Sequence, residues 1–81
     1  MTYNAKDIER MNSTKGTMNR DQFMNYIGEN YNIDGAGMRL IGNALFYAES
    51  RFETRADRII CLMDLLDGAI GLTYEEIAMF D

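Results

Sequence analysis

Apolar residues recur along this chain at intervals of three and four positions, the spacing that places side chains on one face of an α-helix. The clearest case follows Met18, where Phe23, Ile27 and Tyr31 repeat every fourth residue. The chain contains no proline, and its apolar residues do not alternate with polar ones as they do in half-buried strands. The pattern therefore predicts an all-α fold, a compact bundle of four to five short helices.

Helix-start and turn residues divide this pattern into segments. Capping-box pairs, in which a capping side chain precedes an acidic or amide side chain by three positions, occur at three places: Asn19 and Gln22, Thr54 and Asp57, and Thr73 and Glu76. We expect helices over residues 4–11, 19–30, 34–52, 54–66 and 73–81, with the Asp67-Gly68 turn ending the fourth. Apolar residues occupy most of the circumference of that fourth helix, where Leu62 and Leu65 widen the apolar arc. We therefore expect it to be the central helix of the bundle.

The size and composition of the chain indicate a single small folded unit. A chain of 81 residues buries roughly 60% of its surface on folding. Its apolar content of 47% is sufficient for a compact core. We expect residues 1–17 to form an N-terminal arm or short helix and residues 18–81 to form the helical bundle domain, with Met18 as an alternative start site.

Positive and negative side chains are distributed unevenly along the chain. The last of the eight lysines and arginines is Arg58, and five acids follow it: Asp64, Asp67, Glu75, Glu76 and Asp81. The net charge of −5 therefore belongs to the segment after Arg58. Such segregation favours a binding surface for a basic protein, and we expect these five acids to be partner-binding residues. The alternative is a solvated acidic face that serves solubility.

An aromatic side chain on a polar helix face is a second candidate for partner contact. On the helix expected over residues 34–52, Phe46 falls among Arg39, Asn43 and Ser50, opposite the core stripe. Exposed aromatic residues are frequent anchors of protein interfaces. The alternative is that Phe46 is covered by the N-terminal segment or by the preceding helix.

The side chains that most enzymes use are scarce in this sequence. The chain has no histidine and a single cysteine, Cys61, whose neighbours one helical turn away, Asp57 and Asp64, disfavour a thiolate. The turn at residues 30–35 resembles the first half of an EF-hand calcium loop, but Ile41 occupies the position of the bidentate glutamate. We therefore expect no enzymatic activity, no cofactor and no bound metal.

The sequence also bears on the cellular location. No apolar run approaches the roughly 18 residues that a membrane span needs, and the first ten residues, which include Lys6, Asp7, Glu9 and Arg10, contain no apolar segment of the kind found in signal peptides. The single cysteine suits a reducing compartment, in which no disulfide framework forms. We therefore expect a cytoplasmic protein that does not contact a membrane.

A short segment near the C-terminus resembles part of a DNA-binding motif. Residues 71–78, with sequence GLTYEEIA, resemble the supporting helix of helix-turn-helix domains such as region four of bacterial sigma factors. Together with Arg51, Arg55 and Arg58, this resemblance defines one alternative function, a nucleic-acid-associated transcriptional regulator. However, the negative charge gathered at this end would repel phosphate, and Glu53 and Asp57 are spaced to pair with the arginines. We therefore expect no direct contact with nucleic acid.

The chain as a whole resembles a class of small proteins from phages and mobile elements. Its acidity, small size, helical character and scarcity of catalytic residues are similar to those of anti-CRISPR proteins. The resemblance implies a stoichiometric inhibitor that occupies the basic nucleic-acid groove of a CRISPR effector nuclease or similar host enzyme. A structural or assembly protein that acts as a homo-oligomer, through Phe46 and the methionines, is a further alternative.

Overall fold

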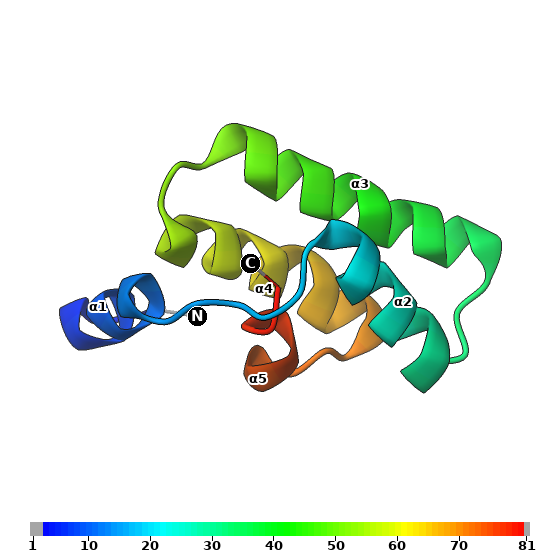
Figure 1. Cartoon of the computed structure of the whole chain (residues 1–81), viewed down its shortest axis with the longest axis horizontal. Helices are drawn as coiled ribbons and strands as arrows, with labels where there is room; N and C mark the ends of the chain where they lie inside the picture. Colours follow the sequence, from blue (N-terminus) through cyan, green and yellow to red (C-terminus); the bar gives the residue numbers. More distant parts are fainter. Residues whose placement is uncertain (1–2, 81) are drawn as a thin grey trace.

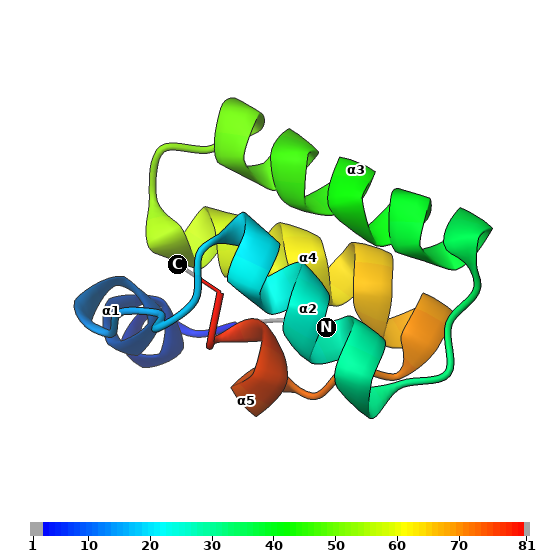
Figure 2. The same cartoon turned by 45° about the vertical axis from the view of Figure 1, so that its right-hand side comes forward.

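The described part of the chain folds into five helices, which Figures 1 and 2 show in two views. The computed structural model describes residues 3–80, apart from the side chains of residues 67–69. The helices are α1 (Ala5–Ser13), α2 (Arg20–Asn30), α3 (Gly35–Arg51), α4 (Arg55–Ile70) and α5 (Tyr74–Ile77). Within the described residues the only extended pairing is an isolated bridge between Met18 and Phe80. The prediction of an all-α bundle of four to five short helices is confirmed.

Helix α4 lies at the centre of the bundle, as its broad apolar arc predicted. It packs against α1, α3 and α5, whereas α2 packs against α3. A short connection at residues 52–54 joins α3 to α4, and the two helices run antiparallel, side by side in both views. The pair α3 and α4 therefore forms the scaffold on which the other helices are placed.

The predicted start signals operate where the sequence places them. Complete capping boxes are present at Asn19 and Thr73, and a third, at Asn4, begins α1. The Thr54 hydroxyl accepts a hydrogen bond from the backbone N–H of Asp57 at 3.3 Å. In each case a side-chain oxygen satisfies a backbone donor of the first helical turn, which has no partner within the helix.

Helix α4 is longer than the sequence pattern predicted. The expectation that Asp67-Gly68 would end this helix is wrong, since α4 continues to Ile70. Gly71 has a positive φ of 71°, and this left-handed conformation is the one that commonly ends helices. The chain then reverses and places Leu72 in the core with no exposed surface. Burial of Leu72 therefore accompanies a later helix end than the turn-forming dipeptide predicted.

The expected ends of the first and last helices also shift. Helix α1 extends two residues beyond the expected range, to Ser13, and α5 ends at Ile77 rather than at the end of the chain. After α5 the chain forms a turn in which the N–H groups of Met79 and Phe80 bond to the carbonyl groups of Glu76 and Ile77. Phe80 follows this turn and is buried in the core.

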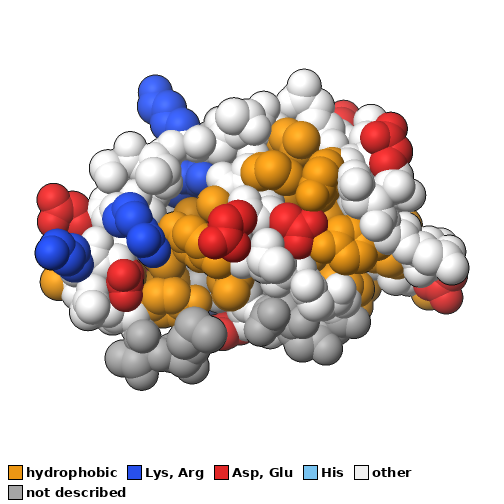
Figure 3. All heavy atoms as spheres, turned by 90° about the horizontal axis from the view of Figure 1, so that it is seen from below, with side chains coloured by type: hydrophobic (Ala, Val, Ile, Leu, Met, Phe, Trp, Pro, Cys, Tyr) orange, Lys and Arg blue, Asp and Glu red, His pale blue; other side chains and the backbone are white. Residues whose placement is uncertain are grey.

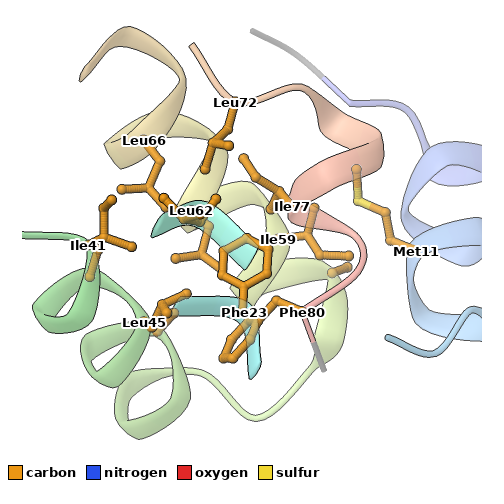
Figure 4. Close-up of a cluster of buried hydrophobic side chains, with 14 residues drawn as sticks. Met11, Phe23, Ile41, Leu45, Ile59, Leu62, Leu66, Leu72, Ile77 and Phe80 are labelled. Carbon is orange, nitrogen blue, oxygen red and sulfur yellow. The ribbon is translucent and has the colours of Figure 1, made fainter. Parts of the chain in front are cut away.

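One apolar core joins all five helices (Figure 4). The largest side chains buried within it are Phe23, Met11, Ile27, Ile41, Leu45, Ile59, Leu62, Leu66, Leu72 and Ile77. Leu62 and Leu65 do not share an environment, because Leu62 is completely buried whereas Leu65 is 46% exposed. The apolar arc of α4 is therefore wider than the core that it serves.

Residues 14–18 and α1 are attached to the bundle by both apolar and polar contacts. Met11 is completely buried and points from α1 toward Ile77 of α5 (Figure 4). The Asn12 side chain accepts a hydrogen bond from the backbone N–H of Ala56 at 2.8 Å, near the start of α4. Beyond α1, the N–H groups of Thr17 and Met18 both donate to the Met79 carbonyl, each at 2.9 Å.

Candidate functional site

Helices α3 and α4 leave apolar side chains uncovered on one side of their contact. Leu40 is 53% exposed and Tyr47 is 50% exposed, and both lie on α3, whereas the partly exposed Leu65 lies on α4. Together with Asn43 and Ala44 they line a hollow of about 450 Å³. Few monomeric proteins leave large apolar side chains contiguous and exposed without a functional reason.

A second hollow continues the first along the same pair of helices. It has a volume of about 310 Å³ and shares Tyr47 and Leu65 with the first hollow. Its remaining lining residues are Phe52, Asp57, Ile60, Cys61 and Asp64. We call the two hollows together the α3–α4 groove.

Two carboxylates border this apolar groove. Asp57 and Asp64 are both exposed and are the charged residues among those that line the two hollows. They lie seven residues apart on α4, two helical turns, so both occupy the same edge of the groove. The groove therefore combines an apolar floor with one acidic edge.

The local sequence explains why α3 carries two apolar faces. Its core stripe contains Ile41, Leu45 and Ala48, all fully buried. Leu40 and Tyr47 lie one position before Ile41 and Ala48, about 100° around the helix, and so they project beside the core rather than into it. Sequence reasoning missed this second stripe, although the spacing of Leu40 and Tyr47 over two turns is a visible signal.

Cys61 lies in the groove but is a poor nucleophile. Burial raises the pKa of its thiol, and the negative charge of Asp64 raises it further. The thiol therefore remains protonated near neutral pH, in agreement with the prediction that neighbouring acids disfavour the thiolate. The side chain adds apolar surface to the groove rather than reactivity.

Phe46 is exposed, but it does not belong to the α3–α4 groove. Its side chain is 59% exposed, so the alternative that a neighbouring segment covers it is wrong. The Arg20 guanidinium of α2 lies 5.5 Å from the centre of the Phe46 ring and 3.8 Å from the Glu49 carboxylate. Phe46 therefore lies on the edge of α3 that faces α2, away from Leu40 and Tyr47.

The Glu76 carboxylate joins α5 to α2. It accepts hydrogen bonds from the hydroxyl groups of Tyr31 at 2.6 Å and Tyr26 at 2.9 Å, and from the Thr73 N–H at 3.1 Å. These bonds, above all that from Tyr31, lower the pKa of Glu76, while the same carboxylate raises the pKa of Tyr31 to about 12. Among the five acids expected to bind a partner, Glu76 already has intramolecular partners.

The remaining acids after Arg58 do not gather at a common site in the described structure. Glu75 lies in a hollow of about 360 Å³ with Arg10 and Lys15, between α1 and α5. Asp64 lies instead in the α3–α4 groove. Asp81 and the side chain of Asp67 lie outside the described part of the chain.

The arrangement of charge in space differs from its arrangement along the chain. On the face shown in Figure 3, basic side chains lie toward the end where α1 lies, and acidic side chains lie both beside them and elsewhere on the face. Two cations from the first part of the chain, Arg10 and Lys15, line the same hollow as the C-terminal acid Glu75. Segregation of charge in a sequence does not by itself create a charged face.

Two arginines of the expected basic cluster hold backbone carbonyl groups. Arg55 donates from its two terminal nitrogens to the carbonyls of Phe80 at 2.6 Å and Ala78 at 2.5 Å. Arg58 donates from Nε to the Phe52 carbonyl at 2.8 Å. The predicted pairing with Glu53 and Asp57 is not found among the ion pairs of the described residues. Backbone carbonyls, rather than those acids, accept hydrogen bonds from these two guanidinium groups, while the buried Nε of Arg55 has no hydrogen-bond partner in the described part of the chain.

The turn that resembles half of an EF-hand loop serves as a helix cap. Asp34 accepts a hydrogen bond from the backbone N–H of Gly37 at 2.7 Å and begins α3, while the Asn30 side chain donates to the Tyr26 carbonyl at 2.8 Å. Within the described residues, no group of three or more potential metal-ligating side chains is found. The polar residues of this turn are therefore used in ending one helix and starting the next.

Comparisons with protein-family models, with curated proteins and with solved structures found no match to this chain. In the described part of the chain, no helix has the length and apolar character needed to cross a membrane. The class of protein that the fold defines is a small all-α bundle with a partly apolar, partly acidic groove between its two longest helices.

Proposed function

We propose that this protein is a non-catalytic binding module for a basic protein partner. The observation that carries the proposal is the α3–α4 groove, in which exposed apolar side chains lie beside Asp57 and Asp64. Apolar anchors surrounded by polar residues are the usual composition of a protein-binding surface. The thiol of Cys61 has a raised pKa, which favours a binding role over a nucleophilic one.

The charge of the protein supports a basic partner. The net charge of −5 attracts cationic surfaces and accelerates encounter with them. In the more specific form of this proposal, the partner is a nucleic-acid enzyme such as a CRISPR effector nuclease, and the protein inhibits it by occupying its basic groove. The resemblance to small acidic anti-CRISPR proteins supports this form.

Two features of the structure weigh against the alternatives. For a nucleic-acid-associated regulator, the arginine cluster would have to contact phosphate, but Arg55 and Arg58 donate to backbone carbonyls. For a homo-oligomer formed through the α3–α4 groove, a two-fold arrangement that pairs α4 of one copy with α4 of the other would place Asp57 and Asp64 near the same acids of the second copy. Both arrangements are less favourable than binding of a basic partner.

Competition with nucleic acid provides the test of the proposal. The immobilised protein would be used to capture a partner from cell extract at low salt, and the captured partner would be identified and purified. We expect elution as salt rises, because exposed charge pairs are screened beyond about 8 Å at physiological ionic strength. We also expect the nucleic-acid affinity of the partner to fall as the protein saturates it at equal stoichiometry. A saturated partner that binds nucleic acid as tightly as before would contradict the inhibitory form of the proposal.

The same assay separates acidic from basic contributions. Asp64→Asn with Glu75→Gln should weaken capture, whereas Arg51→Gln should leave it unchanged or strengthen it. Glu76 is left intact in this design because its loss would remove the hydrogen bonds that join α5 to α2. The regulator alternative requires the opposite order, with direct binding to DNA or RNA that Arg51→Gln weakens.

A further inference from the structure

We infer that the α3–α4 groove binds an amphipathic helix of the partner, with an apolar stripe and with lysine or arginine along one flank of that stripe. This inference rests on the proposed function and adds the place of binding and the chemistry of the bound segment. It follows from the length of the groove, from its hydrogen-bonding properties and from the position of its charges.

The length of the groove matches a few turns of helix. Leu40 and Tyr47 lie seven residues apart on α3, which corresponds to about 10 Å along the helix axis, and Phe52 extends the lining to about 18 Å. A helix of about twelve residues covers the same distance. Because α3 and α4 run antiparallel, a third helix can lie along the seam between them and pack as a further member of the bundle.

Hydrogen bonding favours a helical over an extended occupant. The backbone groups of α3 and α4 are paired within their own helices, so the groove offers no row of backbone donors and acceptors to an added strand. An extended segment buried there would leave its own N–H and C=O groups without partners, which is costly. A helix satisfies these groups internally and presents only side chains to the groove.

The two hollows specify how the apolar side chains of the partner are spaced. They lie next to each other along the seam and meet at Tyr47 and Leu65. Two apolar anchors one or two turns apart on the bound helix would enter one hollow each. Leu40 and Leu65 would contact the first anchor, and Phe52 would contact the second.

The charges specify the flank of the bound helix. Asp57 and Asp64 border the groove on the α4 edge, whereas the polar lining residue on the α3 edge is the uncharged Asn43. A bound helix would therefore carry lysine or arginine on the flank that faces α4, at positions two turns apart. This asymmetry also sets the orientation of the partner helix, because rotation about its axis would move the cations away from the acids.

A synthetic peptide provides a direct probe. The probe is an amphipathic peptide of about 18 residues, with leucine at i, i+3, i+4 and i+7 spacing and lysine elsewhere. The first control peptide has the same composition in an order that destroys the stripe, and the second replaces lysine by glutamate. We expect the lysine peptide to bind at least about tenfold more tightly than either control, and its affinity to fall as salt rises. Equal affinity for the ordered and disordered lysine peptides would overturn the inference, since it would reveal attraction to net charge alone.

Matched variants locate the binding site. Leu40→Ala with Leu65→Ala should weaken peptide binding by about tenfold or more, while Phe46→Ala, an exposed aromatic outside the groove, should change it by less than about twofold. Circular dichroism would verify that each variant is folded. If Phe46→Ala weakened binding as much as the leucine pair, the groove would not be the binding site.

A second matched pair tests the acidic edge. Asp57→Asn with Asp64→Asn should slow association severalfold and reduce its salt dependence. Glu9→Gln with Glu29→Gln changes the net charge equally at exposed sites outside the groove, and it should have little effect. An equal loss in both pairs would show that only the net charge matters.

Chemical-shift mapping of the unmodified protein gives a readout that does not depend on variants. Addition of the lysine peptide should shift the amide signals of α3 and α4 along the groove. Shifts centred on α1 and α5 would overturn the inference. A dimer of the free protein that Leu40→Ala with Leu65→Ala abolishes would also overturn it, since a second copy would then occupy the groove.

If a captured partner continues to bind the groove variants with undiminished affinity, the groove inference fails while the proposed function stands. If no basic protein partner binds at all, the proposed function itself fails.

Discussion

Replacement of the Met11 side chain by that of alanine tests whether α1 is an integral part of the fold. Met11 is fully buried, belongs to the same core as Phe23 and Leu62, and points toward Ile77. Met11→Ala would remove a long side chain from this core and leave a cavity between α1, α4 and α5. Because α1 lies at the edge of the bundle, it can shift only partly to fill that space.

The expected cost follows from measurements on buried side chains. Substitution of a buried methionine by alanine costs about 2–5 kcal/mol, against a total unfolding free energy of about 4–12 kcal/mol for a domain of this length. A loss of about 3 kcal/mol corresponds to a fall in melting temperature of about 12–24 °C. Chemical denaturation followed by circular dichroism would measure the loss, and a single transition with an unchanged slope would show that α1 unfolds together with the bundle.

An exposed position on the same helix provides the control. Glu9 is exposed, and Glu9→Ala should change the unfolding free energy by less than about 0.5 kcal/mol. Asn12→Ala should have an intermediate effect, about 1 kcal/mol, because the Asn12 side chain accepts the Ala56 N–H. A cost below about 1 kcal/mol for Met11→Ala would refute this reasoning and would make α1 a loosely attached arm.

The remaining predictions concern charge and backbone conformation. Because the folded-state pKa of Glu76 is lowered, chiefly by the Tyr31 hydroxyl, its contribution to stability is present above the ordinary value of 4.5 and is lost as the pH falls through the folded value. Unfolding measured across acidic pH should show this loss, and Glu76→Gln should reduce it. Because the pKa of Tyr31 is raised to about 12, the corresponding stability is fully present below pH 10.0 and is lost as the pH rises through the folded value of about 12. Ultraviolet titration should detect this late ionisation, and Glu76→Gln should move it toward 10.0. Gly71→Ala should lower the unfolding free energy by about 1 kcal/mol, because Gly71 has a positive φ. Gly35→Ala should be neutral or stabilising, because an added Cβ there meets no atom within 4 Å. Thermal or chemical unfolding would measure both, and equal effects would contradict the argument.

Most of the helical architecture could be predicted from the sequence because its signals are local. A capping box acts within one turn, and an apolar stripe such as Phe23 and Ile27 is visible within two turns. These signals correctly located the starts of α2, α3 and α5. The end of α4 could not be predicted from local signals, because it coincides with the burial of Leu72 in the core.

The candidate site could be predicted less well, because its exposure depends on packing between distant segments. Leu40 and Tyr47 have the same chemistry as core residues, and a sequence pattern does not show which apolar stripe a neighbouring helix will cover. Phe46 was recognised as an aromatic residue on a polar face, but its contact with Arg20 required the placement of α2 against α3.

The amino-acid sequence by itself therefore determined the helical class, most helix starts and the net charge, since each depends on composition or on residues within a turn or two. The tertiary structure decided how the acidic residues are used. It brought Tyr26 and Tyr31 to Glu76 across 50 and 45 positions of sequence, and it placed Glu75 in a hollow with Arg10 and Lys15. It left Asp64 beside an uncovered apolar groove. The physical reason is that a carboxylate can act on a partner only where the packing of distant helices leaves it without a partner of its own.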